Sequence, residues 1–175
     1  MEWSAEDEVP YRRTAKTVAK HDVIVIGASA GGVEALTRIF SKLPAGDLQA
    51  AIFVVLHIGS HGRSQLAAIL SRADGLRARV PENHETIHFG EVYVAPSDHQ
   101  LMIEDGTVEI TKGPKENRSR PAINPLFRSA AYAFGPRVIG VVLTGMLDDD
   151  TAGLWEIKRR GGIAIRKCRG TQWPM

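Results

Sequence analysis

The sequence predicts an α/β protein in which a doubly wound, mostly parallel sheet lies between two layers of helices. The types of the segments and their order along the chain predict this three-layer fold. Short apolar runs rich in β-branched residues, typical of strands buried on both faces, alternate with segments of helical periodicity. Strands and helices that alternate at this spacing form parallel sheets with right-handed crossovers. One strong turn signal, Asp105-Gly106, adds an antiparallel β-hairpin.

Length and composition fit one globular domain. The chain has 175 residues, of which 43% are hydrophobic and 24% charged, enough to bury a core without disulfides or a structural metal. The single cysteine, Cys168, excludes an internal disulfide and a cysteine-built zinc site. The net charge of +2 is too small to predict nucleic-acid binding. No apolar stretch approaches the length of a membrane span, and we expect a soluble, cytoplasmic protein.

The first half of the chain contains two strand–helix units. Residues 1–21 are polar and aperiodic and are predicted to be a tail or linker, and residues 22–175 are predicted to form the domain. Two wholly apolar runs predict strands, and the periodic segments after them predict helices. In order, these elements are the strand Val23 to Ile26, the helix Gly32 to Leu43, the strand Ala51 to Leu56, and a helix from about Arg63 to Arg72.

The second half contains the hairpin and three further strands. The hairpin spans Gln100 to Ile110, and a polar loop follows at 112–120. Asn124 is predicted to cap a helix that has Pro125 at its first position and ends at Gly135-Pro136. The other elements are the strands Glu91 to Ala95, Val138 to Leu143 and Gly162 to Ile165, and a helix from about Thr151 to Arg160.

Three predicted strand ends carry reactive side chains, and ligands of open α/β sheets gather at this edge. The first, Gly27-Ala28-Ser29-Ala30-Gly31, has the spacing G-x-S-x-G, in which a serine sits on a sharp turn before a helix. The N–H after the serine and the helix dipole would then face an oxyanion. A phosphate-binding turn is the competing interpretation, although the segment lacks the lysine of a P-loop and does not fit G-x-G-x-x-G.

The second strand end is His57 and the third is an acidic loop. His57 directly follows an apolar strand, with His61 as the fallback. After Leu143 the sequence reads Thr144-Gly145-Met146-Leu147-Asp148-Asp149-Asp150. Three carboxylates could ligate Mg²⁺ or Ca²⁺, but consecutive side chains seldom converge on one ion. Asp150 could instead cap the next helix, and one carboxylate could orient the ring of His57. Together the three ends supply the nucleophile, base and acid that acyl transfer needs.

Five separated motifs make this interpretation more specific: VIVIGASAGGVEAL, the histidine of VVLHI, EVYVAPSDHQL, RPAINPLFRSAA, and VIGVVLTGM followed by acids. In this order they resemble the catalytic domain of the chemotaxis protein-glutamate methylesterases of the CheB type. The resemblance runs from Val23 to the end of the chain. It implies an α/β hydrolase-like domain that removes methyl esters from glutamates of chemoreceptors and often deamidates glutamines there.

The resemblance also implies a role for individual residues. The matching positions are Ser29 for the nucleophile, His57 for the general base, Asp149 for the acid, and Ala30 and Met146 for the oxyanion hole. Leu147 and Asp150 stand where the family usually has glycine, which keeps Asp148 open as an alternative acid. Relative to the family, we expect no receiver domain in front and a C-terminus truncated by one helix and one strand.

We therefore expect a protein-glutamate methylesterase that requires no metal or organic cofactor. Its substrate would be a methylated chemoreceptor-type protein, and we expect no nucleic-acid partner and no insertion into a membrane. The alternative from another class is a non-catalytic module that keeps the fold in order to dock on a sensory receptor or kinase. Methanol release from a methylated receptor would separate the two.

Overall fold

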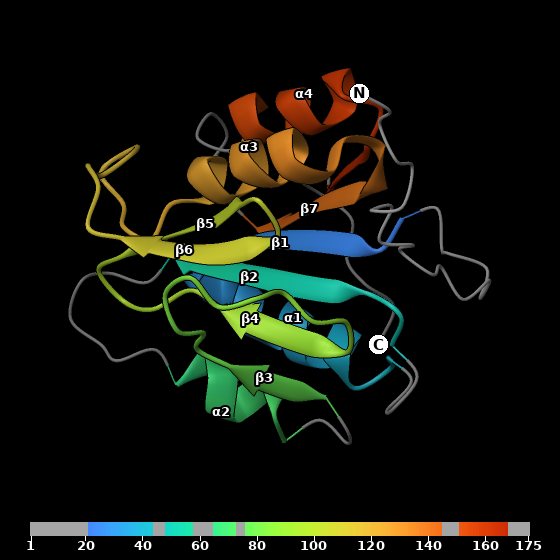
Figure 1. The fold of residues 1–175 in the computed structure, drawn as a ribbon. Helices are drawn as coiled ribbons and strands as arrows, with labels where there is room; N and C mark the ends of the chain where they lie inside the picture. Colours follow the sequence, from blue (N-terminus) through green and yellow to red (C-terminus); the bar gives the residue numbers. More distant parts are fainter. Residues whose placement is uncertain (1–20, 44–47, 58–64, 73–75, 145–150, 168–175) are drawn as a thin grey trace, which may run out of the picture.

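A six-stranded sheet in which all neighbouring strands are parallel forms the centre of the molecule, in the order β3-β4-β2-β1-β7-β8 (Figure 1). The computed structural model describes residues 21–43, 48–57, 65–72, 76–144 and 151–167. The strands of the sheet are β1 (Val23–Ser29), β2 (Ala51–His57), β3 (Arg77–Arg79), β4 (Glu91–Val94), β7 (Val138–Thr144) and β8 (Ile163–Arg166). This arrangement confirms the predicted α/β fold.

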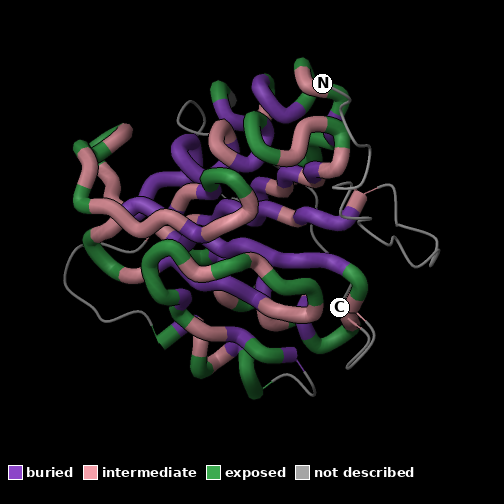
Figure 2. Tube along the Cα trace, in the orientation of Figure 1, coloured by how far each residue is buried: buried purple, intermediate pink, exposed green. Residues whose placement is uncertain are grey.

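Helices cover both faces of the sheet. The helical elements are the 3-10 turn η1 (Ala30–Gly32), α1 (Val33–Phe40), α2 (Leu66–Leu70), α3 (Ile123–Phe134), the 3-10 turn η2 (Gly135–Arg137) and α4 (Thr151–Arg159). Side chains alternate along β1, so that Val25 packs in the core beneath α3 and Ile26 packs in the core beneath α1. Figure 2 shows the central strands as largely buried. In the described part of the chain, no helix combines the length and apolar character needed to cross a bilayer.

The predicted hairpin consists of β5 (Gln100–Glu104) and β6 (Thr107–Thr111). Its turn residues Asp105 and Gly106 both have positive φ, 46° and 78°, as a two-residue hairpin turn requires. The hairpin forms a sheet of its own and does not extend the main sheet. Its apolar residues, such as Leu101 and Val108, pack into the core that α3 shares with the main sheet, so the hairpin covers α3.

Two strands differ from the sequence expectation by more than one residue at an end. β1 continues three residues beyond Ile26, because both neighbours still pair with it there: Ala28 pairs with Thr144 of β7, and Ser29, the last residue, pairs with His57 of β2. β3 was not predicted, since Arg77–Arg79 contains only one apolar residue. It lies at an edge of the sheet, where charged side chains can reach water.

Candidate active site

The three strand ends that carry reactive residues are neighbours in space. β1 is the central member of the trio β2-β1-β7, so the end of β1 lies between the other two. Ser29 and His57 are direct partners in the parallel register of β1 and β2. Neighbouring strands lie about 4.8 Å apart, which brings the two side chains within reach of each other. The sheet thus places the predicted nucleophile beside the predicted base.

Ser29 is the last residue of β1 and has extended backbone, with φ −88° and ψ 177°. The predicted turn from strand to helix is present: Ser29 is the N-cap residue of η1, which starts at Ala30 and leads directly into α1. The Ser29 side chain makes no capping hydrogen bond to this turn. The first N–H groups of a helical segment lack partners within it, so Ala30 lies where a backbone N–H can receive an oxyanion.

His57 presents a ring nitrogen without a partner. Nε2 is buried and forms no hydrogen bond to any residue that the structure describes, and it is the one such side-chain atom in that part of the chain. Buried polar atoms are nearly always hydrogen-bonded, so each exception in a folded protein needs an explanation. A general base needs an acceptor that is held in place and available to a proton.

A close contact between α3 and β1 lies at Gly27, two residues before the serine. A Cβ on Gly27 would come within 2.6 Å of the Ile123 side chain, so only glycine allows α3 to begin at this height above β1. Ile123 is 2% exposed and is the first residue of α3. The glycine that precedes the serine in G-x-S-x-G therefore sets the position of α3 relative to the site.

Asn124 does not cap its own helix. The prediction was wrong because Ala122 occupies the N-cap position of α3 and Asn124 lies inside the first turn. The Asn124 side chain points to α4, where its Oδ1 accepts a hydrogen bond of 2.8 Å from the N–H of Gly153. It thereby caps the first turn of α4 from a different helix. Gly153 suits this contact, since a Cβ there would lie 2.9 Å from the same Oδ1.

Asp149, the acid predicted for the third strand end, lies outside the described residues. So do Met146, Asp148, Asp150 and His61. The structure does describe both flanks of the acidic loop. β7 ends at Thr144, and its register against β1 shifts between Gly27 and Ala28, so β7 carries one extra residue beside the site. The loop therefore leaves the sheet next to Ser29 and rejoins the fold at the turn that Asn124 caps. Within the described ranges, no three His, Cys, Asp or Glu side chains gather as a metal site.

The comparison with protein families agrees with this geometry. The chain matches the family model of the CheB methylesterase over residues 24–171. The chain belongs to this family. The matched residues include the ends of β1, β2 and β7 and the first turn of α4. These are the elements that surround Ser29 and His57.

Similar proteins of the family include two curated enzymes and one solved structure. A protein-glutamate methylesterase/protein-glutamine glutaminase of Methanosarcina acetivorans is 37% identical in an alignment of 172 residues that covers 94% of this chain and 48% of that protein. One of Paramagnetospirillum magneticum is 34% identical over 95% of this chain and 45% of that protein. The Thermotoga maritima CheB methylesterase catalytic domain has a TM-score of 0.78 and 34% identity, over 86% of this chain and 82% of that one. The chain thus spans about half the length of the curated relatives it matches.

Proposed function

We propose that this chain hydrolyses γ-methyl esters of glutamate side chains on a chemoreceptor-type protein by a Ser–His–Asp mechanism. One observation carries the proposal: Ser29 and His57 are register partners at adjacent strand ends, and Nε2 of the histidine has no hydrogen-bond partner in the described part of the chain. The names of the similar proteins support the same reaction and add glutamine deamidation.

In the first half of the reaction, the Ser29 hydroxyl oxygen attacks the ester carbonyl while His57 Nε2 takes its proton. The negative charge that develops on the carbonyl oxygen is received by backbone N–H groups at Ala30 and Met146. Asp149, following β7, accepts a hydrogen bond from the other ring nitrogen and holds the imidazole. The intermediate then breaks its bond to the methoxy oxygen, His57 returns the proton to this oxygen, and methanol leaves.

In the second half, water attacks the acyl-serine and gives its proton to His57. Collapse of this intermediate releases the glutamate carboxylate, and the proton returns to the Ser29 oxygen. A glutamine side chain follows the same steps with ammonia as the leaving group. Water thus supplies the new oxygen in both reactions, and neither needs an oxidant or a reductant.

The test measures methanol release from a methylated receptor. Ser29→Ala and His57→Ala should each reduce turnover by roughly 10⁴ to 10⁶, and the double variant should lose little more, because members of a triad act as a unit. Ser41→Ala and His84→Ala are matched controls on exposed positions outside the site and should retain the wild-type rate within about twofold.

Two outcomes would contradict the proposal. Additive losses in the double variant, or normal turnover in Ser29→Ala, would remove the serine–histidine unit. Binding of the receptor by the wild-type chain without any methanol release would indicate instead the non-catalytic docking module.

A further inference from the structure

The segment between β6 and α3 is strongly basic. Residues 112–120 read Lys-Gly-Pro-Lys-Glu-Asn-Arg-Ser-Arg, with four basic residues and one acid, and are called the basic loop below. The acid, Glu116, is paired with Arg128 of α3. Lys112, Lys115 and Arg118 are exposed and form no ion pair within the described part of the chain. The loop therefore presents three exposed positive charges that are not held in ion pairs by the described residues.

The fourth basic residue, Arg120, fixes the base of the loop. Its guanidinium donates to Asp98 Oδ1 at 2.7 and 2.9 Å, and to the carbonyl oxygens of Lys112 and Gly113 at 3.1 and 3.0 Å. Gln100 adds two bonds, donating to the Pro114 carbonyl at 2.9 Å and accepting from the N–H of Ala122 at 2.8 Å. These bonds join the start and the end of the loop, so its charges are held in one place.

The tip of the loop is a tight turn. The N–H groups of Glu116 and Ser119 donate to each other's carbonyl oxygens, and Asn117 and Arg118 between them both have positive φ, 51° and 64°. Such a conformation is unfavourable for an arginine. A two-residue turn between paired residues requires positive φ at both of its central positions, so the turn fixes the place of the Arg118 backbone. Arg118 is exposed at this turn.

The basic loop lies at the same edge of the sheet as the candidate site. It runs directly into Ile123, which packs over Gly27 two residues before Ser29. Its anchor, Asp98, lies in the loop that follows β4, the neighbour of the strand that ends at His57. Arg120, with Lys112 and Lys115 close by, holds the pKa of Asp98 below its ordinary value. Figure 1 shows the segment between β6 and α3 projecting beyond the sheet at this edge.

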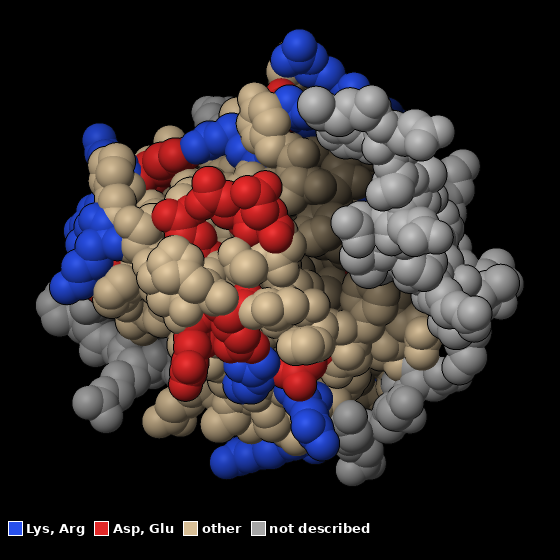
Figure 3. Space-filling model, in the orientation of Figure 1, with Lys and Arg blue, Asp and Glu red and all other residues tan. Residues whose placement is uncertain are grey.

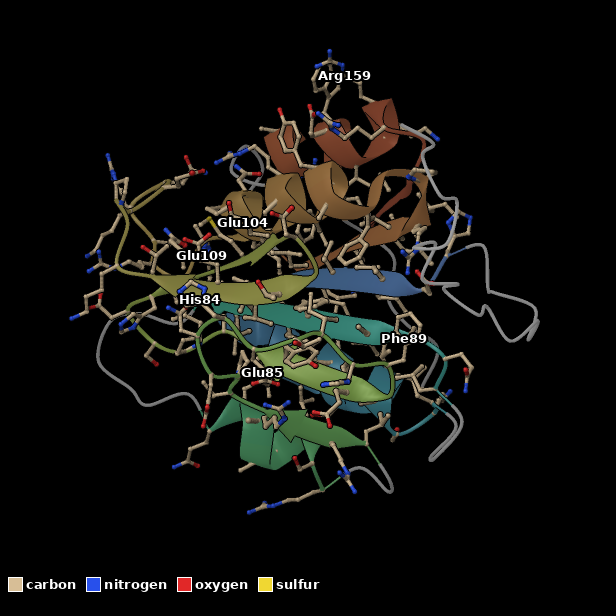
Figure 4. All side chains as sticks on the ribbon, viewed as in Figure 1. His84, Glu85, Phe89, Glu104, Glu109 and Arg159 are labelled. Carbon is tan, nitrogen blue, oxygen red and sulfur yellow. The ribbon has the colours of Figure 1, made fainter. Side chains whose placement is uncertain are left out.

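Acidic side chains occupy a different face. Figure 3 shows them gathered over the front of the molecule, and Figure 4 places Glu104 and Glu109 on the hairpin and Glu85 in front of β4. Figure 3 shows Lys and Arg on other parts of this face as well, and Glu85 is paired with Arg79, so part of the acidic charge is compensated. The exposed cations of the basic loop attract an acidic ligand to the edge beside the site.

We propose that the basic loop is a docking surface for a glutamate-rich segment of the substrate protein, in which carboxylates flank the esterified glutamate. This proposal rests on the proposed function. Each hydrolysed ester leaves a new carboxylate, so a segment with several modified glutamates becomes more acidic as it is processed. Lys112, Lys115 and Arg118 would bind these carboxylates while the remaining ester reaches Ser29.

The test uses two synthetic peptides, each with one glutamate γ-methyl ester. In one the flanking residues are glutamates, and in the other they are glutamines. The variant Lys112→Glu/Lys115→Glu/Arg118→Glu should lower kcat/KM for the glutamate peptide, relative to the glutamine peptide, by about tenfold or more at 50 mM salt. The difference should shrink strongly at 500 mM salt, because the charges are exposed.

A matched control reverses the same number of charges elsewhere. Lys42, Arg72 and Lys158 are exposed and lie at the C-terminal ends of α1, α2 and α4, at the opposite edge of the sheet. Lys42→Glu/Arg72→Glu/Lys158→Glu should change the peptide preference less than twofold. An equal loss in this control, or an equal loss on both peptides in the loop variant, would overturn the proposal.

Binding separates this proposal from the proposed function. Fluorescence anisotropy of the labelled glutamate peptide without its methyl group requires no turnover. The wild-type chain should bind it, and the loop variant should bind it at least tenfold more weakly. If no methanol is released but this difference is found, the proposed function fails and the docking surface stands. If methanol is released but the two proteins bind the peptide equally, the docking surface fails alone.

Discussion

Replacing Gly27 by alanine tests how closely α3 must approach the strand that ends at the candidate nucleophile. The new Cβ would lie 2.6 Å from Cδ1, 2.7 Å from Cγ2 and 2.9 Å from Cγ1 of Ile123. Carbon atoms in contact prefer about 3.5 to 4.0 Å. All three atoms belong to one side chain that is 2% exposed, so Ile123 cannot relieve the overlap by turning into water. Either this side chain or the start of α3 must move.

Overpacking of this kind lowers the free energy of unfolding by about 1 to 3 kcal/mol. Ile123→Ala alone removes the three clashing atoms and leaves a cavity, which lowers it by about 2 to 5 kcal/mol. In the double variant the added methyl group enters the space that the isoleucine left. The two losses should therefore fall short of additivity by about 1 to 3 kcal/mol, the range expected for residues in contact.

Urea unfolding of the wild type, the two single variants and the double variant measures this coupling. Gly31→Ala is the stability control in the same motif, because a Cβ there meets no atom within 4 Å, and it should lose little stability. Methanol release from Gly27→Ala should also fall, since Ser29 is two residues away. Strictly additive losses, or a Gly27→Ala protein as stable as the wild type, would show that Ile123 does not fix the distance between α3 and β1.

Three further outcomes are expected. Asn124→Ala should lower the free energy of unfolding in urea by about 1 to 2 kcal/mol, because the first turn of α4 loses its cap, and Asn124→Asp, which keeps an acceptor oxygen, should recover most of it. The Arg79 guanidinium lowers the pKa of Glu85 from 4.5 to about 2. Glu85→Gln should therefore lower the free energy of unfolding at pH 7 by about 1 kcal/mol, less than the full pKa shift corresponds to, because water screens this partly exposed pair. That difference is complete above pH 4.5 and should vanish as the pH of the unfolding series falls towards 2; a constant difference would contradict it. Asp149→Asn should lower kcat strongly with the fold intact while Asp148→Asn stays mild, and the reverse result would assign the acid to Asp148.

The local elements were predictable because their signals are local. Apolar β-branched runs predicted β1, β2 and β7, and Asp105-Gly106 predicted the hairpin turn, since both depend only on residues near in sequence. The strand end also predicted the edge at which Ser29 and His57 lie, because parallel strands share a carboxyl edge. β3 escaped prediction because a three-residue edge strand with two arginines carries no apolar period.

What the sequence could not decide was which distant groups meet. A capping residue followed by proline reads as the start of its own helix, yet Asn124 binds the N–H of Gly153, because the packing of α3 against α4 brings that unpaired donor to its side chain. The hairpin covers α3 and does not extend the sheet, since its apolar face needed a helix to pack against. The sequence by itself determined the strands other than β3, the hairpin turn and the reactive residues at the strand ends. Only the tertiary structure decided the register that pairs Ser29 with His57 and the partners of buried polar atoms, because both depend on contacts between segments far apart in the chain.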